Sequence, residues 1–243
     1  MACFLTFAIV AYLLPLIGAT ELEARNATAC TPVHLFLARG TTEDYPGTLG
    51  SLADMVVDAV SGGEYENIIY PATDESSTSS YFEGRQAVAQ QLNAYVAKCP
   101  LSKIALLGYS QWVKADRTEG AMIIGDALAG GGGDPSGVLG KATAPTISPE
   151  LGSHVTAVSF YGDPRHVPYR LFDIGNSTFN VTGKYPRTTG QISVIDALYS
   201  SKVHDYCNEG DPVCASGDNL QAHLEYSEKW DTIASSWLVS MLQ

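Results

Sequence analysis

The sequence predicts an α/β fold, a three-layer α/β/α sandwich in which helices cover both faces of a central, mostly parallel sheet. Apolar runs of strand length alternate with longer segments of helical periodicity along the chain, a pattern typical of parallel sheets. The chain has 243 residues, 45% of them hydrophobic, which is enough for one sizeable core. We therefore expect a single domain over residues 20–243, without linkers or internal repeats.

Residues 1–19 are expected to be a signal peptide. Phe4 to Ile17 is almost continuously apolar, and Gly18 and Ala19 are small residues suited to signal peptidase. This run is short for a membrane span, and no other segment approaches the roughly eighteen apolar residues that a span needs. The sequence thus predicts a secreted, extracellular protein that does not associate with membranes.

The first expected elements are a buried strand and a helix. Val33 to Ala38 is an apolar run that Gly40 stops, as is typical of a buried strand. Ser51 and Asp54 resemble a capping box, so we expect a helix from there to the glycine pair at 62–63.

Three further elements complete the first half of the domain. Asn67 to Tyr70 is expected to be a short strand, since Pro71 follows it. Tyr81 to Ala97 has a helical pattern that Pro100 closes, and the apolar run Ile104 to Leu107 predicts the next strand.

The second half is less regular. We expect a helix over Ala121–Leu128, a strand over Val155–Tyr161 and a C-terminal helix over Glu225–Leu242. The stretch 165–189 is expected to be irregular, and 192–198 fits a helix or a strand. A glycine run at 130–133 follows a helix and lacks a following Lys-Ser or Lys-Thr, so we interpret it as a turn rather than a phosphate loop.

The surface charge argues against one class of partner. The net charge is −12 and the isoelectric point is about 4.7, and the chain has no basic cluster. Nucleic acid is therefore not expected as a partner, and acidity of this kind keeps a secreted protein soluble. We expect a monomer. Sequons that fit a secretory route are Asn26, Asn176 and Asn180.

The cysteines predict disulfides. Cys3 lies in the expected signal peptide, which leaves Cys30, Cys99, Cys207 and Cys214. Four cysteines allow three pairings, but Cys207 and Cys214 are close enough to form a small loop, leaving Cys30 and Cys99 as a long bridge. A zinc site is the alternative, although no C-x-x-C or regular histidine spacing supports it.

A candidate nucleophile lies at the end of the third expected strand. Gly108-Tyr109-Ser110 follows the apolar run and precedes a helical segment, the layout of a nucleophile elbow that lifts a serine hydroxyl clear of the sheet. The usual G-x-S-x-G pattern has a second glycine because the following helix packs close to the strand. Trp112 stands at that position, and the next glycine is Gly120.

A serine nucleophile needs a base, normally a histidine that a carboxylate orients. In elbow-containing hydrolases the chain order is Ser, then Asp or Glu, then His. His204 and His223 both follow Ser110 in the chain. The acids that could orient either histidine are Asp163, Asp196, Asp205, Asp211 and Asp218.

The small cysteine loop favours one of these pairs. If Cys207 and Cys214 are joined, Asp211 lies in a stiff ring that can hold its carboxylate toward a base, and this favours Asp211 with His223. The alternative is that Asp211 belongs to an ordinary surface turn and His223 to an ordinary loop.

An oxyanion would also need donors. The N–H of Gln111 directly follows the serine at an expected helix start, where the helix dipole favours negative charge. A second donor is expected from the loop after the first strand, where Gly40 lets the backbone turn and Thr41 offers an N–H and a hydroxyl. The alternative is that Thr41 or Thr42 caps a helix.

Taken together, these segments resemble the cutinase/acetylxylan esterase family. The resemblance covers nearly the whole mature chain and rests on Ala38-Arg39-Gly40-Thr41-Thr42-Glu43, Gly108-Tyr109-Ser110-Gln111, Gly162-Asp163-Pro164, the segment Asp205 to Cys214, and His223. It implies a small α/β-hydrolase fold without a large lid, and no cofactor or metal.

The same resemblance implies a role for each site residue. Ser110 would be the nucleophile, His223 the base and Asp211 its orienting acid. The implied oxyanion donors and disulfide bridges are Thr41, Gln111, Cys30–Cys99 and Cys207–Cys214.

The segment after the serine departs from the family pattern. Family members run G-Y-S-Q-G, and removing Trp112 to Glu119 from this chain restores that pattern. An insert that leaves both flanks intact favours a gene-model error. If the insert is real, it either rotates the apolar face of the helix or bulges as a loop, and the chain is then a weak or inactive esterase.

The sequence predicts a secreted serine esterase that deacetylates plant cell-wall xylan. Tyr70-Pro71-Ala72 and Asp211-Pro212 resemble the acetylxylan branch. The loop at 216–222 is more polar than the apolar rim expected of an enzyme that binds long cutin chains. A cutinase that hydrolyses cutin polyester is the alternative within the family, so the expected partner is an acylated polysaccharide or a polyester. A catalytically impaired secreted module that still binds carbohydrate is the alternative from another class.

Overall fold

The computed structural model describes residues 30–73, 79–110, 119–175 and 178–243. By its contacts the chain divides into residues 1–30 and 31–243, and every element below belongs to the second unit. Several sequence predictions fall outside the described residues: the signal peptide at 1–19, Asn26, Asn176, Gln111 and most of the insert (112–118).

Within the described residues, six parallel strands form one sheet in the order β2-β1-β3-β4-β6-β5. The strands are β1 (Val33–Ala38), β2 (Gly63–Asn67), β3 (Lys103–Tyr109), β4 (Val155–Tyr161), β5 (Asp173–Ile174) and β6 (Val203–Tyr206). Because the strands are parallel, their carboxyl ends lie along a single edge, which is where open α/β sheets build their sites.

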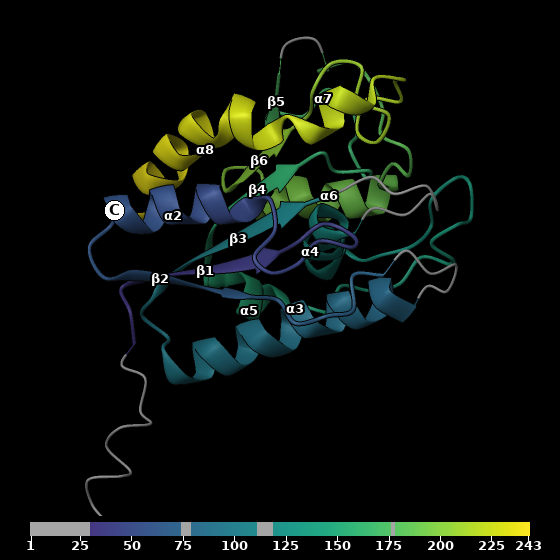
Figure 1. Ribbon diagram of the computed structural model, residues 1–243. Coiled ribbons are helices and arrows are strands. Elements are labelled where there is room, and N and C mark those ends of the chain that lie inside the picture. The colour runs from purple at the N-terminus through teal and green to yellow at the C-terminus, as the bar shows by residue number, and fades with distance from the viewer. Residues whose placement is uncertain (1–29, 74–78, 111–118, 176–177) are drawn as a thin grey trace, which may run out of the picture. The chain divides into compact units, whose positions relative to one another are not determined.

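Helices cover both faces of this sheet. They are α2 (Leu49–Ala59), α3 (Ser79–Lys98), α4 (Gly120–Ala129), α5 (Pro149–Ser153), α6 (Thr189–Leu198), α7 (Leu220–Leu224) and α8 (Tyr226–Leu242). Helices α2 and α8 pack together on one face, and α3, α4 and α6 lie on the other (Figure 1). The predicted three-layer α/β/α sandwich is confirmed.

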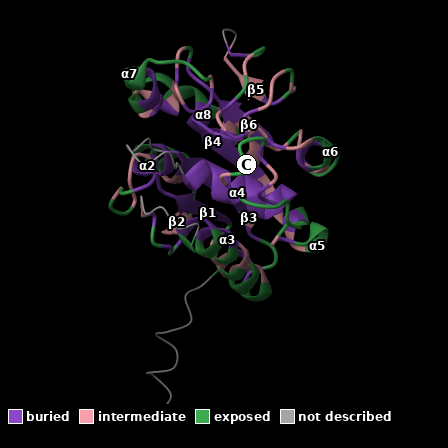
Figure 2. Cartoon of the chain, turned by 90° about the vertical axis from the view of Figure 1, so that its right-hand side faces the viewer, coloured by how far each residue is buried: buried purple, intermediate pink, exposed green. Residues whose placement is uncertain are grey.

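The core consists of two apolar clusters, one on each face. Alternate residues of β1 supply both, since Leu35 and Leu37 face α2 and α8 whereas Phe36 faces α3 and α4. Burial on both sides explains why most residues of β1 and β3 are apolar, with no alternation of polar residues. Figure 2 shows the sheet and α4 buried, with exposed residues on the outer sides of the surface helices.

Two predicted elements are misplaced. The expected capping box at Ser51 and Asp54 is wrong, because α2 begins at Leu49 and the Ser51 hydroxyl instead donates to Asp231. The strand expected at Asn67–Tyr70 lies earlier, at Gly63–Asn67. This edge strand is polar and half-buried, so its sequence carries little apolar signal.

Other elements agree with the sequence predictions, or resolve a segment for which the sequence fitted either a helix or a strand. β4 spans Val155–Tyr161 as predicted, and the segment 192–198 belongs to α6, which a Thr188–Gln191 capping box starts. The stretch expected to be irregular contains the two-residue strand β5. In the part of the chain described, none of the helices has the length and apolar character that would let it cross a membrane.

Candidate active site

Ser110 directly follows β3, at the carboxyl edge of the sheet. Its backbone N–H donates to the carbonyl oxygen of Tyr161 at the end of β4, at 3.0 Å. The Ser110 side chain is completely buried, and its Oγ has no hydrogen-bond partner among the described residues. Ser110 thus lies where an elbow nucleophile lies, directly after the strand, but its hydroxyl is buried and is not hydrogen-bonded to His223 Nε2, which has no partner among the described residues either.

The helix that follows the insert begins at Gly120 and packs against the strand ends. A Cβ atom on Gly120 would overlap the carbonyl oxygens of Ala38 and Tyr109, and one on Gly108 would lie 2.7 Å from Cα of Ala121. Gly120 therefore does what the second glycine of an elbow does, although it lies eight positions later than usual. Every residue of α4 is buried, and most of the insert before it (112–118) lies outside the described residues.

His223 and Asp211 form a buried pair. The Nδ1 atom of His223 lies 2.7 Å from Oδ2 of Asp211, and both side chains are completely buried. The other carboxylate oxygen, Oδ1, accepts the backbone N–H groups of Val213 at 2.6 Å and Cys214 at 3.3 Å. Nε2 of His223 has no partner in the described part of the chain. An imidazole oriented through Nδ1 with a free Nε2 is the arrangement of a general base.

The histidine packs against the strand ends next to Ser110. Its ring stacks on Tyr109 at a centroid distance of 5.8 Å, and the Tyr109 hydroxyl donates to the His223 carbonyl at 3.1 Å. On the neighbouring strand, a Cβ on Gly162 would lie only 2.8 Å from Cε1 of His223. Gly162 follows Tyr161, which binds the Ser110 N–H. His223 therefore contacts Tyr109, the residue before Ser110. It also lies against Gly162, the residue after the one whose carbonyl binds the Ser110 N–H.

A disulfide encloses the acid. Cys207 and Cys214 are joined, with Cα atoms 5.8 Å apart, and Asp211 lies between them in the chain. Cys30 and Cys99 are disulfide-bonded as well, so the zinc alternative for the cysteines is wrong.

The remaining candidate acids and the second histidine lie elsewhere. His204 stacks on Trp237 at 3.7 Å, and burial lowers the pKa of His204 to about 4. Asp196 pairs with Arg170 on the surface, and Asp218 is exposed. None of these residues contacts His223 in the described structure.

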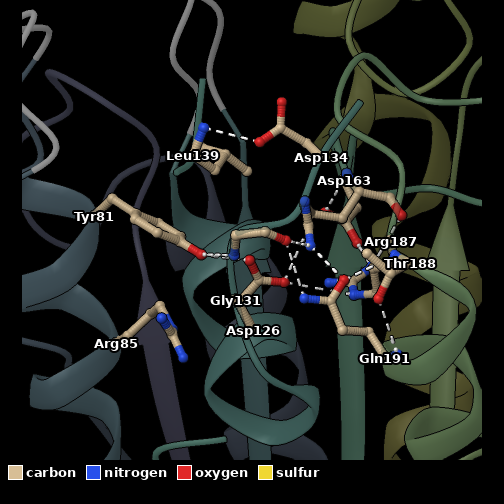
Figure 3. Close-up of polar contacts among 12 residues, drawn as sticks. Tyr81, Arg85, Asp126, Gly131, Asp134, Leu139, Asp163, Arg187, Thr188 and Gln191 are labelled. Carbon is tan, nitrogen blue, oxygen red and sulfur yellow. Dashed lines mark hydrogen bonds and ion pairs between the residues drawn. The ribbon is translucent and has the colours of Figure 1, made fainter. Parts of the chain in front are cut away.

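Asp163 belongs to a buried polar network that includes Asp126 of α4 (Figure 3). Its carboxylate accepts Arg187 Nη1 at 2.5 Å and the Arg165 N–H at 2.9 Å. Burial raises the pKa of Asp126 in the same network, although Arg165 and Arg187 oppose the rise. The network holds the loop that starts at Gly162, and so supports the backbone beneath the histidine.

The glycine run at 130–133 contributes to this network as a turn. Gly132 has a φ of 66°, and its carbonyl accepts Arg165 Nη2 at 2.9 Å and Gln191 Nε2 at 3.1 Å. The carbonyl of Gly132 thus accepts hydrogen bonds from buried polar side chains, and the run is a turn rather than a phosphate-binding loop.

One group could in principle hold a cation. Ligand atoms of His166, Asp173 and Asp205 lie within 4.8 Å of one another. However, His166 Nδ1 already bonds Asp205 Oδ2 at 2.8 Å and Nε2 faces the Thr178 carbonyl at 3.3 Å. Burial alone would lower the pKa of His166, but the two carboxylates outweigh it and raise the pKa to about 9. In the described structure these contacts form a buried, hydrogen-bonded pair between His166 and Asp205.

The loop after β1 has the features of an oxyanion site. Thr41 is fully buried, and its Oγ1 is unpaired among the described residues. Glu43 shapes the loop by accepting the N–H groups of Gly40 at 2.7 Å and Thr48 at 2.9 Å. The alternative that Thr41 or Thr42 caps a helix is wrong, since the residue before α2 is Thr48.

Sequence reasoning did not single out Tyr226, Asn208 or the structural role of Gly162. Tyr226 contacts both members of the His223–Asp211 pair. Its position three residues after the histidine, a spacing that can bring side chains together, was the available signal.

Comparison with known proteins identifies related chains. The family model described as Cutinase matches residues 29–242. Cutinase 11 of Verticillium dahliae is 31% identical over 226 residues, which cover 88% of this chain and 70% of the relative. Acetylxylan esterase 2 of Talaromyces purpureogenus is 30% identical, with 94% of this chain and 92% of the relative covered.

Solved structures give the same picture. An acetylxylan esterase determined at 0.90 Å resolution superposes with a TM-score of 0.74 at 31% identity, covering 88% of this chain and all of that one. The catalytic core domain of acetyl xylan esterase from Trichoderma reesei also has a TM-score of 0.74, at 28% identity and with the same coverage.

Proposed function

This chain belongs to the cutinase family of carboxylic ester hydrolases, and we propose that it removes small acyl groups, in particular acetyl groups from xylan, through an acyl-enzyme on Ser110. One observation carries the proposal: His223 is oriented by Asp211 through Nδ1, while its Nε2 is unpaired in the described structure and the ring lies against the strand ends beside Ser110.

In the first half-reaction, Ser110 Oγ attacks the ester carbonyl carbon while His223 Nε2 takes the hydroxyl proton. Asp211 stabilises the imidazolium that forms. The C–O bond to the leaving alcohol then breaks, and His223 returns its proton to that oxygen. The acyl group is left on Ser110.

In the second half-reaction, a water molecule attacks the acyl-enzyme while His223 Nε2 takes one of its protons. The carboxylic acid leaves, and Ser110 recovers its proton from His223. In both tetrahedral intermediates the oxyanion is bound by Thr41, through its N–H and its hydroxyl, which is unpaired among the described residues. The N–H of Gln111 is the second donor, and its contribution depends on whether the insert lets it lie at a helix start.

Two observations favour a short acyl group. Residues 216–221, which lead to the histidine, are exposed and mostly polar. Two of the similar proteins described above are named acetylxylan esterases. The expected substrate is thus an acylated polysaccharide, and the protein is expected to work as a monomer.

Rates on p-nitrophenyl acetate and p-nitrophenyl palmitate, and acetate release from acetylated xylan, test this choice. Faster cleavage of the acetate ester and release of acetate from xylan support the proposal. A preference for palmitate would instead favour cutin polyester as the substrate.

Secretion is part of the proposal. The Cys207–Cys214 bridge and the disulfide-bonded state of Cys30 and Cys99 suit an oxidising compartment. Asn180 is exposed and available to a glycan, whereas Asn26 and Asn176 lie outside the described residues. Mass spectrometry of the protein from culture medium would reveal cleavage near residue 19 and any glycan on these asparagines.

A catalytically impaired homologue is the second candidate, and the insert together with the enclosed Ser110 favours it. A fluorophosphonate probe separates the two, with Ser110→Ala as the unreactive control. Labelling of the full-length folded protein supports the active esterase. If only a variant without Trp112–Glu119 is labelled, the impaired form is correct, and transcript reads lacking those codons would identify the insert as a gene-model error.

A further inference from the structure

Tyr226 shares the carboxylate oxygen that orients the base. It is the first residue of α8 and is completely buried. Its hydroxyl donates to Oδ2 of Asp211 at 2.6 Å, the oxygen that also lies 2.7 Å from His223 Nδ1. Among the described residues, no other side chain apart from His223 donates to this carboxylate.

The direction of this hydrogen bond is set by its surroundings. A carboxylate can only accept, so the Tyr226 O–H donates, and the backbone N–H of Asn208 donates to the Tyr226 oxygen at 3.0 Å. Burial, followed by the charge of Asp211, raises the pKa of Tyr226 well above 10. The hydroxyl therefore keeps its proton wherever an esterase of this type works.

The tyrosine ring is held on several sides. It stacks on Tyr161 at a centroid distance of 5.4 Å and lies edge-on to His223 at 5.9 Å. A Cβ on Gly162 would lie 3.2 Å from its Cε2, so the missing side chain leaves room for the ring. A rigid ring delivers its hydroxyl to a constant position.

Asn208 links this tyrosine to the backbone before the base. Its side-chain Nδ2 donates to the carbonyl of Ala222 at 2.7 Å, and its Oδ1 accepts the indole N–H of Trp230 at 2.8 Å. One residue in the disulfide ring thus fixes both the Tyr226 oxygen and the residue preceding His223.

We propose that Tyr226 is a positioning residue for the acid of the catalytic triad: its hydroxyl holds the Asp211 carboxylate in the orientation that meets His223 Nδ1, and draws negative charge away from Oδ2. This inference rests on the proposed Ser110–His223–Asp211 mechanism. Without the hydroxyl, the carboxylate is freer to rotate, and its undivided charge stabilises the imidazolium more strongly.

The test compares Tyr226→Phe with the control Tyr95→Phe. Tyr95 lies on α3, where its hydroxyl is 3.0 Å from Thr31 Oγ1 and donates to Ser102 at 3.3 Å, beside the amino end of β3. In Tyr226→Phe we expect kcat to fall about tenfold with KM within about twofold, because small misplacements of catalytic groups are costly. We also expect the acid limb of the kcat/KM profile to move to higher pH. Tyr95→Phe should change neither.

Two further measurements test the role of Tyr226 even if Tyr226→Phe does not fold or the protein is inactive. Tyr226→3-fluorotyrosine preserves the shape and strengthens the donor, so the acid limb should move to lower pH even if Tyr226→Phe fails to fold. The low-field proton resonance of His223 Nδ1–H should shift in the Tyr226 variants and stay in place in Tyr95→Phe, whether or not the protein is active.

The experiments distinguish a failure of the proposed function from a failure of the inference about Tyr226. A wild-type protein that neither hydrolyses acetate esters nor reacts with a fluorophosphonate contradicts the proposed function, while the proton resonance still tests Tyr226. An active wild type whose folded Tyr226 variants keep kcat, the acid limb and the resonance unchanged overturns the inference.

Discussion

His223 and Asp211 are twelve residues apart in the chain, and Nδ1 of the one lies 2.7 Å from Oδ2 of the other with both side chains completely buried. The disulfide between Cys207 and Cys214 encloses the acid, and two backbone N–H groups from within that ring hold its second oxygen. The acid is therefore placed by short-range covalent structure, whereas the base is placed by packing on the ends of β3 and β4.

Replacing the acid should abolish most of the activity. Asp211→Asn keeps the size of the side chain but removes the charge that fixes the histidine tautomer, and we expect kcat on p-nitrophenyl acetate to fall by about 10³–10⁴. Asp196→Asn, which breaks a surface ion pair with Arg170, is the control and should keep its rate. A kcat in Asp211→Asn within tenfold of the wild type would contradict the assigned role.

A side chain at position 162 should displace the base. Gly162 has a φ of 66°, and a Cβ there would meet His223 Cε1 at 2.8 Å. Gly137 is a matched control, with a φ of 72° and open space around its Cβ position. Both alanine variants should lose roughly 1–2 kcal/mol of unfolding free energy from backbone strain. Only Gly162→Ala should also lose kcat, by about 10²-fold, as measured on purified folded protein.

Removing the insert should preserve the fold and raise activity. Gly120 already packs at the start of α4, so joining Gln111 to it restores the usual elbow and places the Gln111 N–H at a helix terminus. One oxyanion donor is worth about 10²–10³ in rate, so kcat should rise by up to that factor. Equal rates and equal melting temperatures in the two proteins would show that the insert is neutral.

The buried His166 ion pair should make stability depend on pH in alkaline solution. The folded-state pKa of His166 is raised to about 9, above the 6.5 of the unfolded chain. Its contribution is therefore fully present below pH 6.5 and is lost as pH rises through 9. Burial, with Asp205, also raises the pKa of Asp173 to about 7, which makes stability fall between pH 4 and 7, so the histidine effect is cleanest above pH 7.

Urea unfolding at pH 7, 8, 9 and 10 measures this effect. The unfolding free energy of the wild type should fall by roughly 2 kcal/mol across that range, and His166→Gln should have a much smaller slope. Parallel slopes in the two proteins would mean that the histidine is neutral in the folded state.

Local sequence patterns predicted the elements whose signals lie within one segment. The apolar run Val155–Tyr161 forms β4 with the predicted bounds, because a strand buried on both faces needs uninterrupted apolar residues. The edge strand β2 was misplaced because its residues, Gly63–Asn67, are half-buried and polar, so its pairing with β1 rather than its composition specifies it.

The sequence by itself determined the family resemblance, the alternation of strands and helices, and the small set of residues from which a triad could be drawn. It could do so because periodicity, glycine positions and cysteine spacing are properties of short segments. The sequence also favoured the pair Asp211 and His223, which the structure brings together, whereas only the tertiary structure shows that Asp163 meets Arg187 and that Tyr226 completes the hydrogen bonds of Asp211. Those contacts join segments from different elements, and the packing of the sheet edge brings them within hydrogen-bonding distance.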